Sequence, residues 1–228
     1  MGNKILIACS KNWFIENKFV KKFLKQNKKK FLIISKKKDL NLTNLNKIKP
    51  KIIFFPHWSY VVSKKIINKY RCICFHTAPL PYGRGGSPIQ NLILKKIKKT
   101  PVCALKMTEK IDSGPIYLKE TINLSGNLDL IFEKISFVIL KMIKKLIKKS
   151  INPKKQRGIP YTFKRIKETV SQIKKIDNIE SFYDRIRMVD AKDYPRSYIK
   201  IKNFKITFSN SKIKKNQIFC DACISKDI

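Results

Sequence analysis

Short apolar segments alternate with amphipathic segments over the first 76 residues, and this alternation allows few folds. Residues 12–26 and 60–70 carry apolar side chains at helical spacing, whereas the apolar segments are too short for helices and are typical of buried strands. An order of strand, helix, strand, strand, helix and strand, with room for another helix between the second and third strands, predicts an open α/β sheet that is mostly parallel. The predicted strands are Lys4–Cys9, Phe31–Ser35, Lys51–Phe55 and Arg71–His76.

The pattern changes after His76. Thr77–Gly86 is rich in Pro and Gly, which predicts a stiff loop. Ser87 followed by Pro88 predicts the start of a helix, with Ser87 as the N-cap and Pro88 at the first helical position. Two further strands, 102–107 and 116–122, flank a tight turn that contains Asp112. No G-x-G-x-x-G follows the first strand, so nothing indicates a dinucleotide site.

The second half of the chain predicts a boundary near residue 150. A long amphipathic helix with a lysine-rich outer face is expected over 128–149, and SINPKKQRGIP after it has the composition of a linker. We therefore expect a catalytic domain over 1–150, a linker over 151–160 and a small C-terminal α+β region over 161–228. That region is expected to hold a helix and two strands, at 178–189, 198–208 and 217–224.

The chain carries a formal charge of +37, which first suggests a nucleic-acid binder. Lysine supplies most of this charge and is spread along the whole chain, together with heavy use of Ile and Asn. An AT-rich coding bias would give this composition, whereas a binding face should concentrate its charge. Compositional bias is the favoured interpretation, and a polyanionic partner stays open as the alternative.

The chain has six cysteines, and their environment is expected to be reducing. No apolar run approaches the length of a membrane span, and the N-terminus shows no secretory signal, so a cytoplasmic protein without membrane association is expected. Cys72 and Cys74 alternate along a strand as small buried hydrophobes, and Cys220 and Cys223 have no histidine nearby. We therefore expect no metal site.

Both histidines of the chain follow predicted strands. His76 ends one strand directly before the Pro/Gly loop, and His57 follows the preceding strand in the sequence Pro56-His57-Trp58. In open α/β sheets, ligands bind outside the carboxyl ends of the strands. On a purely structural interpretation, His76 caps its strand and Asp112 is an ordinary turn residue. The alternative is that they form a catalytic pair.

Two motifs then resemble the folate-dependent formyltransferases, a family that includes methionyl-tRNA formyltransferases and amino-sugar N-formyltransferases. The first is FHTAPLPYGRGGSP over 75–88, and the second is DSGPI over 112–116. The family pattern is N-x-H, a Leu-Pro loop, R-G and a Pro before a helix, followed by D-x-G-x-I, and the two motifs resemble it except at the asparagine. Residues 190–208 also look like the start of the C-terminal region in the methionyl-tRNA and sugar branches. The resemblance implies a Rossmann-like formyltransferase domain.

The resemblance implies that 10-formyltetrahydrofolate gives its formyl group to a primary amine. This reaction needs one proton taken from the amine and one delivered to the leaving nitrogen N10 of the folate. An imidazole suits both transfers near neutral pH, and His76 matches the family histidine. Asp112 matches the family carboxylate that orients the imidazole and favours its charged form.

Cys74 departs from the family pattern, because it occupies the position of an asparagine that donates to the oxyanion. A thiol is a weak donor. Three explanations remain open. Another donor, such as His57, Ser59 or a backbone N–H, replaces the asparagine; or Cys74 marks a subgroup with a rearranged site; or the chain has lost formyl transfer.

The resemblance also implies a folate pocket formed by Pro56, His57, Trp58, Leu80, Pro81 and Gly114. Trp58 or Tyr60 would pack near the folate rings, and the alternative is that both are ordinary hinge aromatics.

The C-terminal region is short for the β-barrel domain that the resemblance implies for methionyl-tRNA enzymes, so a small amine acceptor, an amino-sugar nucleotide, is expected. Methionyl-tRNA is the alternative acceptor, since the charge permits tRNA binding. A decayed, basic nucleic-acid-binding protein is a third hypothesis, and the retained His76 and Asp112 argue against it.

Overall fold

The computed structural model of the chain describes residues 4–226, which form two compact units. Unit 1 comprises residues 4–84, 101–122 and 133–161, and unit 2 comprises residues 85–100, 123–132 and 162–226. Each unit therefore takes segments from several parts of the chain, and the long helix α5 (Leu128–Lys148) contributes to both.

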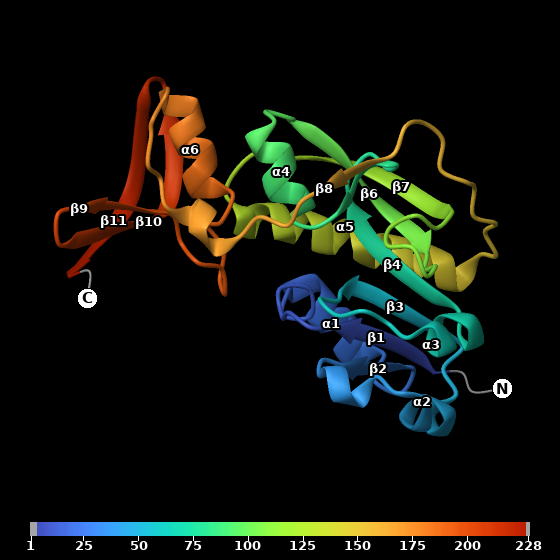
Figure 1. The fold of residues 1–228 in the computed structure, drawn as a ribbon. Coiled ribbons are helices and arrows are strands. Elements are labelled where there is room, and N and C mark those ends of the chain that lie inside the picture. The colour runs from blue at the N-terminus through green and yellow to red at the C-terminus, as the bar shows by residue number, and fades with distance from the viewer. Residues whose placement is uncertain (1–3, 227–228) are drawn as a thin grey trace. The chain divides into compact units, whose positions relative to one another are not determined.

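The main sheet has six strands in the order β2-β1-β3-β4-β6-β7 (Figure 1). Strands β1 to β4 pair in parallel, and β6 pairs antiparallel with β4. The prediction of a mostly parallel α/β sheet is therefore confirmed. The strand bounds are β1 Ile5–Cys9, β2 Phe31–Ile34, β3 Ile52–His57, β4 Cys72–Thr77, β6 Lys99–Lys106 and β7 Ile116–Asn123.

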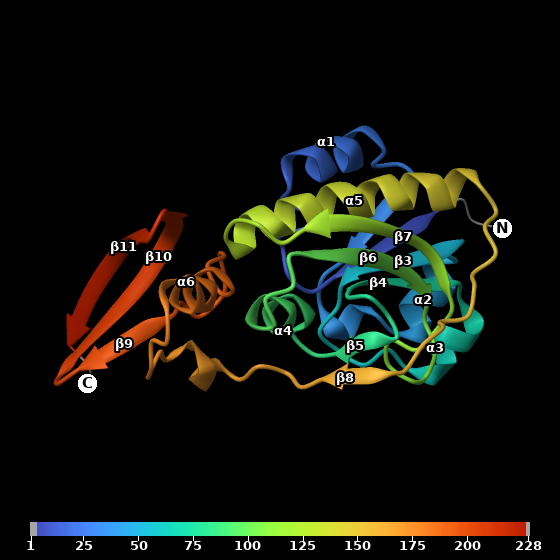
Figure 2. The same ribbon diagram turned by 90° about the horizontal axis from the view of Figure 1, so that it is seen from above.

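The central strands are apolar because both faces of the sheet are covered. All five residues of β1 are buried, and five of the six residues of β3 are buried. On one face, α1 (Lys18–Gln26) lies beside α5 (Figure 2), and Phe19 contacts Phe137 with ring centroids 6.0 Å apart. The short helices α2 (Leu42–Ile48) and α3 (Lys64–Lys69) complete this part of the fold.

Helix α1 begins later than the sequence periodicity predicts. The side-chain oxygen of Asn17 accepts hydrogen bonds from the backbone N–H groups of Phe19 and Val20, at 3.1 and 3.4 Å. An asparagine in this role ends the preceding turn and starts the helix. The apolar side chains before Asn17, Trp13 and Phe14, lie in that turn.

The predicted amphipathic character of α5 is confirmed. Ile139, Leu140 and Ile143 are buried, whereas Lys141 and Lys144 are exposed. The lysines of this helix therefore form a solvated face.

The start of α4 (Pro88–Leu94) corrects one detail of the prediction. Pro88 occupies the first turn as expected, but the Ser87 hydroxyl makes no capping hydrogen bond and Ser87 has φ of 48°. That hydroxyl accepts instead from the backbone N–H of Ile166, at 3.1 Å. Ser87 therefore joins two segments of unit 2 and does not cap the helix with its side chain.

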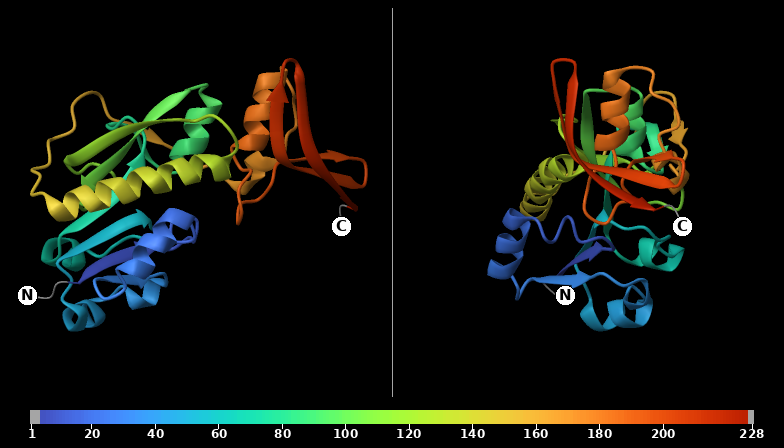
Figure 3. Two further views of the ribbon diagram at one scale, coloured as in Figure 1. Left: turned by 180° about the vertical axis from the view of Figure 1, so that it is seen from behind. Right: turned by 90° about the vertical axis from the view of Figure 1, so that its left-hand side faces the viewer.

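The C-terminal part of unit 2 is an antiparallel sheet in the order β11-β10-β9 with α6 (Ile179–Arg187) packed on it (Figure 3). The predicted strand over 198–208 is two strands, because the chain turns at Lys202, where φ is 51°. Phe182 of α6 contacts Phe208 of β10 with ring centroids 5.7 Å apart. The strands are β9 Tyr198–Ile201, β10 Phe204–Lys214 and β11 Gln217–Lys226.

A separate two-stranded sheet is formed by β5 (Tyr82–Gly85) and β8 (Tyr161–Phe163), and short 3-10 helices cover Lys37–Asp39 and Glu168–Ser171. Within residues 4–226, no helix combines the length and apolar character that a membrane crossing requires.

Candidate active site

His76 lies near the carboxyl end of β4, where a parallel strand presents its side chains to a ligand. Only 8% of its side chain is exposed, so its ring nitrogens depend on protein partners. Nδ1 lies 3.3 Å from Oδ2 of Asp112, and Nε2 lies 2.7 Å from the backbone oxygen of Gly83. Both partners are acceptors, and only the imidazolium form donates to both.

Asp112 occupies the turn between β6 and β7 with φ of 50°, a left-handed conformation that few non-glycine residues adopt. Its side chain is 16% exposed. This backbone conformation is one of the features that direct the carboxylate towards His76. The structure thus brings the two predicted catalytic residues into direct contact.

Gly114 in the same turn is a position where only glycine fits. A Cβ on this residue would lie 1.8 Å from the backbone oxygen of Lys106 at the end of β6. This turn therefore packs directly on the strand backbone, and Gly114 is buried. The close approach is a structural reason for glycine in the DSGPI motif, beside the predicted role in binding folate, which stays a prediction.

Cys74 is half-buried on β4, on the same side of the strand as His76. Burial raises the pKa of its thiol, and the nearby Asp112 carboxylate raises this pKa further. The thiol points at the backbone oxygen of Leu105 on β6, 3.9 Å away. Cys74 therefore joins the His76–Asp112 group as a neutral thiol and not as a nucleophile.

The predicted folate residues on β3 lie at the carboxyl end of that strand. The ring nitrogen Nδ1 of His57 lies 3.4 Å from the Ser10 hydroxyl, which also accepts from the backbone N–H of Ser59, at 3.0 Å. Ser10, which follows β1, thus binds both His57 and Ser59. These are the two side chains that could replace the missing asparagine as the oxyanion donor.

Trp58 packs on the core beneath this edge of the sheet. Its ring contacts Phe55 and Tyr60 with centroids 6.2 and 5.5 Å apart, both edge-on. Among residues 4–226, its buried indole Nε1 finds no hydrogen-bond partner. Pro56 is buried within β3. Contact of Pro56 or Trp58 with folate stays a prediction.

Leu80 and Pro81 lie in the loop that follows β4. Leu80 is 2% exposed and packs with Cys103, Leu105 and Ile116. The Leu80–Pro81 peptide bond is cis, and the backbone oxygen of Pro81 accepts from the N–H of Tyr161, at 3.2 Å. Leu80 therefore anchors the loop in the core, and its predicted contact with folate remains untested.

Sequence reasoning missed Gln156, which lies in the segment predicted to be a linker. Its side-chain nitrogen donates to the backbone oxygens of Asp112 and Gly114, at 2.8 and 2.9 Å. Its side-chain oxygen accepts from Nε and Nη2 of Arg84, at 3.1 and 2.7 Å. No sequence signal identifies Gln156, because its partners are distant in the chain.

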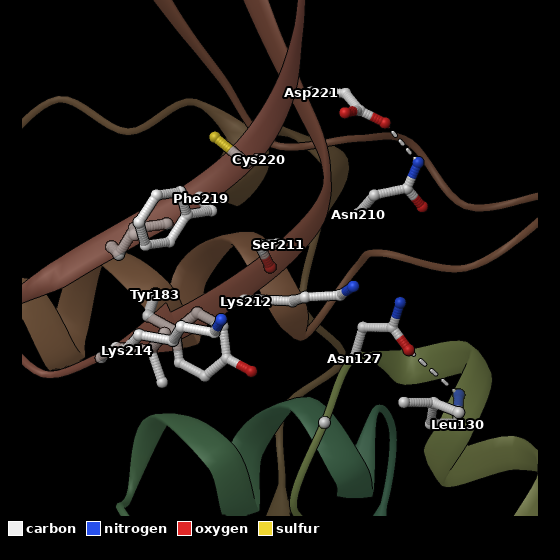
Figure 4. Close-up of a pocket in the computed structure, with 13 residues that line it drawn as sticks. Asn127, Leu130, Tyr183, Asn210, Ser211, Lys212, Lys214, Phe219, Cys220 and Asp221 are labelled. Atoms are coloured by element: carbon white, nitrogen blue, oxygen red, sulfur yellow. Dashed lines mark hydrogen bonds between the residues drawn. The ribbon is translucent and has the colours of Figure 1, made fainter.

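A separate pocket of about 1050 Å³ lies wholly within unit 2 (Figure 4). Asn127, Tyr183 and Lys212 are among its polar lining residues, whereas His76, Asp112 and Cys74 belong to unit 1. Within residues 4–226, no cluster of three or more His, Cys, Asp or Glu side chains is arranged to hold a metal ion.

Comparisons with known proteins cover both halves of the chain. The family profile described as formyl transferase matches residues 11–130, and the profile described as methionyl-tRNA formyltransferase, C-terminal domain, matches residues 168–225. The first profile alone covers more than half of the chain. The resemblance found in the two motifs is therefore confirmed.

A solved structure of a methionyl-tRNA formyltransferase from Clostridium thermocellum is similar over nearly the full length. The identity is 39%, the TM-score is 0.92, and the match covers 98% of this chain and 99% of that one. HypX from Aquifex aeolicus, solved in complex with tetrahydrofolic acid, matches at 14% identity with a TM-score of 0.74, over 94% of this chain and 40% of that one. At this identity the likeness shows the fold alone.

Among curated relatives, a methionyl-tRNA formyltransferase from Sulfurihydrogenibium sp. (strain YO3AOP1) is 26% identical over 181 residues. The match covers 75% of this chain and 58% of that relative, so the chain spans less than two thirds of its length. The two profile matches, the solved relative and the buried His76–Asp112 pair agree with one another. This chain belongs to the formyl transferase family.

Proposed function

We propose that this chain transfers the formyl group of 10-formyltetrahydrofolate to the amino group of methionyl-tRNA. The observation that carries the reaction is the buried contact between His76 and Asp112 at the carboxyl edge of the sheet. The family membership supports the formyl donor, and the tetrahydrofolate complex of a protein with the same fold agrees with it.

The folate supplies the formyl group, and side chains of the protein transfer the protons. The amine nitrogen loses one proton as it bonds to the formyl carbon, and N10 gains one as its bond to that carbon breaks. Nδ1 of His76 faces Asp112, so Nε2 is the ring atom that exchanges protons with the reactants. In doing so, Nε2 gives up its contact with the Gly83 oxygen.

Asp112 supports the proton transfer without contacting the reactants in this proposal. Its carboxylate accepts from Nδ1 and favours the charged imidazole that forms when Nε2 takes a proton. The oxyanion needs a separate donor. Since the Cys74 thiol points at the Leu105 oxygen, we infer that a group other than this thiol supplies that donor.

The comparisons favour methionyl-tRNA over the amino-sugar acceptor that the short C-terminal region suggested. The Clostridium thermocellum protein carries the methionyl-tRNA name and is matched over 99% of its length, so a C-terminal region of this size agrees with that name. The match of residues 168–225 to the C-terminal domain profile points the same way. The charge of +37 also suits a polyanionic acceptor.

The test is formyl transfer to three acceptors by the purified chain with 10-formyltetrahydrofolate. The acceptors are initiator methionyl-tRNA, elongator methionyl-tRNA and an amino-sugar nucleotide, each at about 50 to 200 mM salt. The proposal expects formylation of initiator methionyl-tRNA that persists near 150 mM salt, because specific contacts outlast the screened background. Formylation of the amino sugar alone would overturn the proposed acceptor, and no transfer to any amine would overturn the proposed reaction.

A further inference from the structure

Gln156 contacts both structural elements that hold His76, although it touches neither the imidazole nor the reactants of the proposed reaction. On one side, its amide nitrogen donates to the backbone oxygens of Asp112 and Gly114. On the other, its amide oxygen accepts from Arg84, the residue directly after Gly83. Asp112 and Gly83 are the two acceptors of the His76 ring.

These contacts form a closed circuit within unit 1. The His76 ring contacts Asp112 and Gly83, Asp112 is bound through its backbone oxygen to Gln156, and Gln156 is bound to Arg84 beside Gly83. The two acceptors of the ring lie in different elements, strand β5 and the turn over 112–114, and the Gln156 side chain bridges these two elements. The distance between the two acceptors therefore depends on Gln156.

The chemistry of the bridge requires a carboxamide. The amide nitrogen carries two hydrogens and donates to two backbone oxygens, and the amide oxygen has two lone pairs and accepts two guanidinium hydrogens. All four hydrogen-bonding positions are therefore filled. A glutamate keeps the acceptor for Arg84 but places an oxygen against two carbonyl oxygens.

The backbone at Asp112 explains why such a support matters. Its φ of 50° is an uncommon conformation that persists only where surrounding contacts hold it. Gly114 contacts the Lys106 backbone on one side of the turn, and Gln156 binds two of the turn's carbonyl oxygens. Loss of the Gln156 donors frees this turn to relax and to move the carboxylate away from Nδ1.

We propose that Gln156, together with Arg84, is a positioning residue that sets the geometry of the His76–Asp112 pair from the segment after α5. The effect on turnover rests on the proposed function, whereas the effect on the His76 ring does not. Gln156→Glu removes both donors at nearly constant volume. Asn152→Asp makes the same chemical change at an exposed position of the same segment and is the matched control.

The experiment combines nuclear magnetic resonance with kinetics. The chain has only two histidines, so protein labelled with ¹⁵N-histidine gives separate ring signals for His76, with His57 as an internal reference. We expect the ring N–H signals of His76 to be protected in the parent protein, to broaden or shift in Gln156→Glu, and to stay unchanged in Asn152→Asp. The His57 signals should stay unchanged in both variants.

In formyl transfer, Gln156→Glu should lower kcat by about 10- to 100-fold, with KM for the formyl donor within about threefold, because the reacting groups are misplaced and not lost. If Gln156→Glu does not fold, Arg84→Lys serves as the second variant. It keeps the charge but cannot make the paired contact, and it should shift the same His76 signals with a smaller loss of kcat.

The outcomes separate the two proposals. Altered His76 ring signals in Gln156→Glu, together with a parent protein that transfers no formyl group, would support the positioning role and overturn the proposed function. Formyl transfer together with unchanged His76 signals and unchanged kcat in a folded variant would overturn the positioning role alone. A loss of kcat in Asn152→Asp equal to that in Gln156→Glu would also overturn it.

Discussion

The imidazole Nδ1 of His76 lies 3.3 Å from the carboxylate Oδ2 of Asp112, although His76 lies on β4 and Asp112 lies in the turn between β6 and β7. Both side chains are largely shielded from water, so their interaction is stronger than that of an exposed pair.

Replacement of His76 by alanine should lower turnover by at least about 10²-fold, because the imidazole is the group that exchanges the proton in the proposed reaction. Binding of the folate donor should persist, which equilibrium titration would show alongside steady-state kinetics. Asn152→Ala, at an exposed position, should leave both quantities unchanged. A folded His76→Ala protein with the parent turnover would remove His76 from the mechanism.

Asp112→Asn keeps the size of the side chain but removes its charge. The amide favours the charged imidazole less than the carboxylate does, so kcat should fall by about 10²- to 10⁴-fold while the melting temperature stays close to that of the parent. Steady-state kinetics and thermal unfolding monitored by circular dichroism check the two parts. A parent-like kcat would show that Asp112 has only a structural role in its turn.

Cys74→Asn restores the family pattern at the position two residues before His76. If an asparagine at this position can donate to the oxyanion, turnover should hold or rise, by up to about 10²–10³-fold. The contact of the thiol with the Leu105 oxygen would be replaced by an amide contact. Collapse of activity in a folded variant would show that the site is built around the volume of the thiol.

The buried thiols should resist alkylation at pH 8. Burial raises the pKa of Cys9 and of Cys72 to about 12, and burial followed by the Asp112 carboxylate raises that of Cys74. A raised pKa keeps these groups as unreactive thiols, with a thiolate fraction of about 10⁻⁴ for a pKa near 12. Iodoacetamide followed by peptide mass spectrometry should label the exposed Cys223 first. Labelling of Cys74 as fast as Cys223 would contradict its neutral, half-buried state.

Gly114→Ala should destabilise the fold by about 3 kcal/mol, because the new Cβ would lie 1.8 Å from the Lys106 backbone oxygen and one of the two backbones must shift. The shift should also displace Asp112 and lower kcat. Denaturant unfolding gives the free energy, with Asn152→Ala as a neutral control. An unchanged midpoint would show that the turn relaxes at little cost.

The sequence alone determined the sheet and the two motifs. Short continuous apolar segments identified the strands Ile5–Cys9, Ile52–His57 and Cys72–Thr77 to within one or two residues, because strands buried on both faces must be apolar. His76 and Asp112 were found from their motifs, since their residue types suit proton transfer. The domain boundaries expected at residues 150 and 160 stay a prediction.

Only the tertiary structure decided what surrounds this pair. Gln156 is 44 residues from Asp112 in the sequence and 72 residues from Arg84, so no local sequence pattern indicates either contact. The late start of α1 at Asn17 and the shared use of Ser87 by two segments likewise depend on individual side-chain hydrogen bonds. Periodicity reports which side of an element is buried, whereas the partner of a buried polar group is set by chain segments that meet only when the fold is complete.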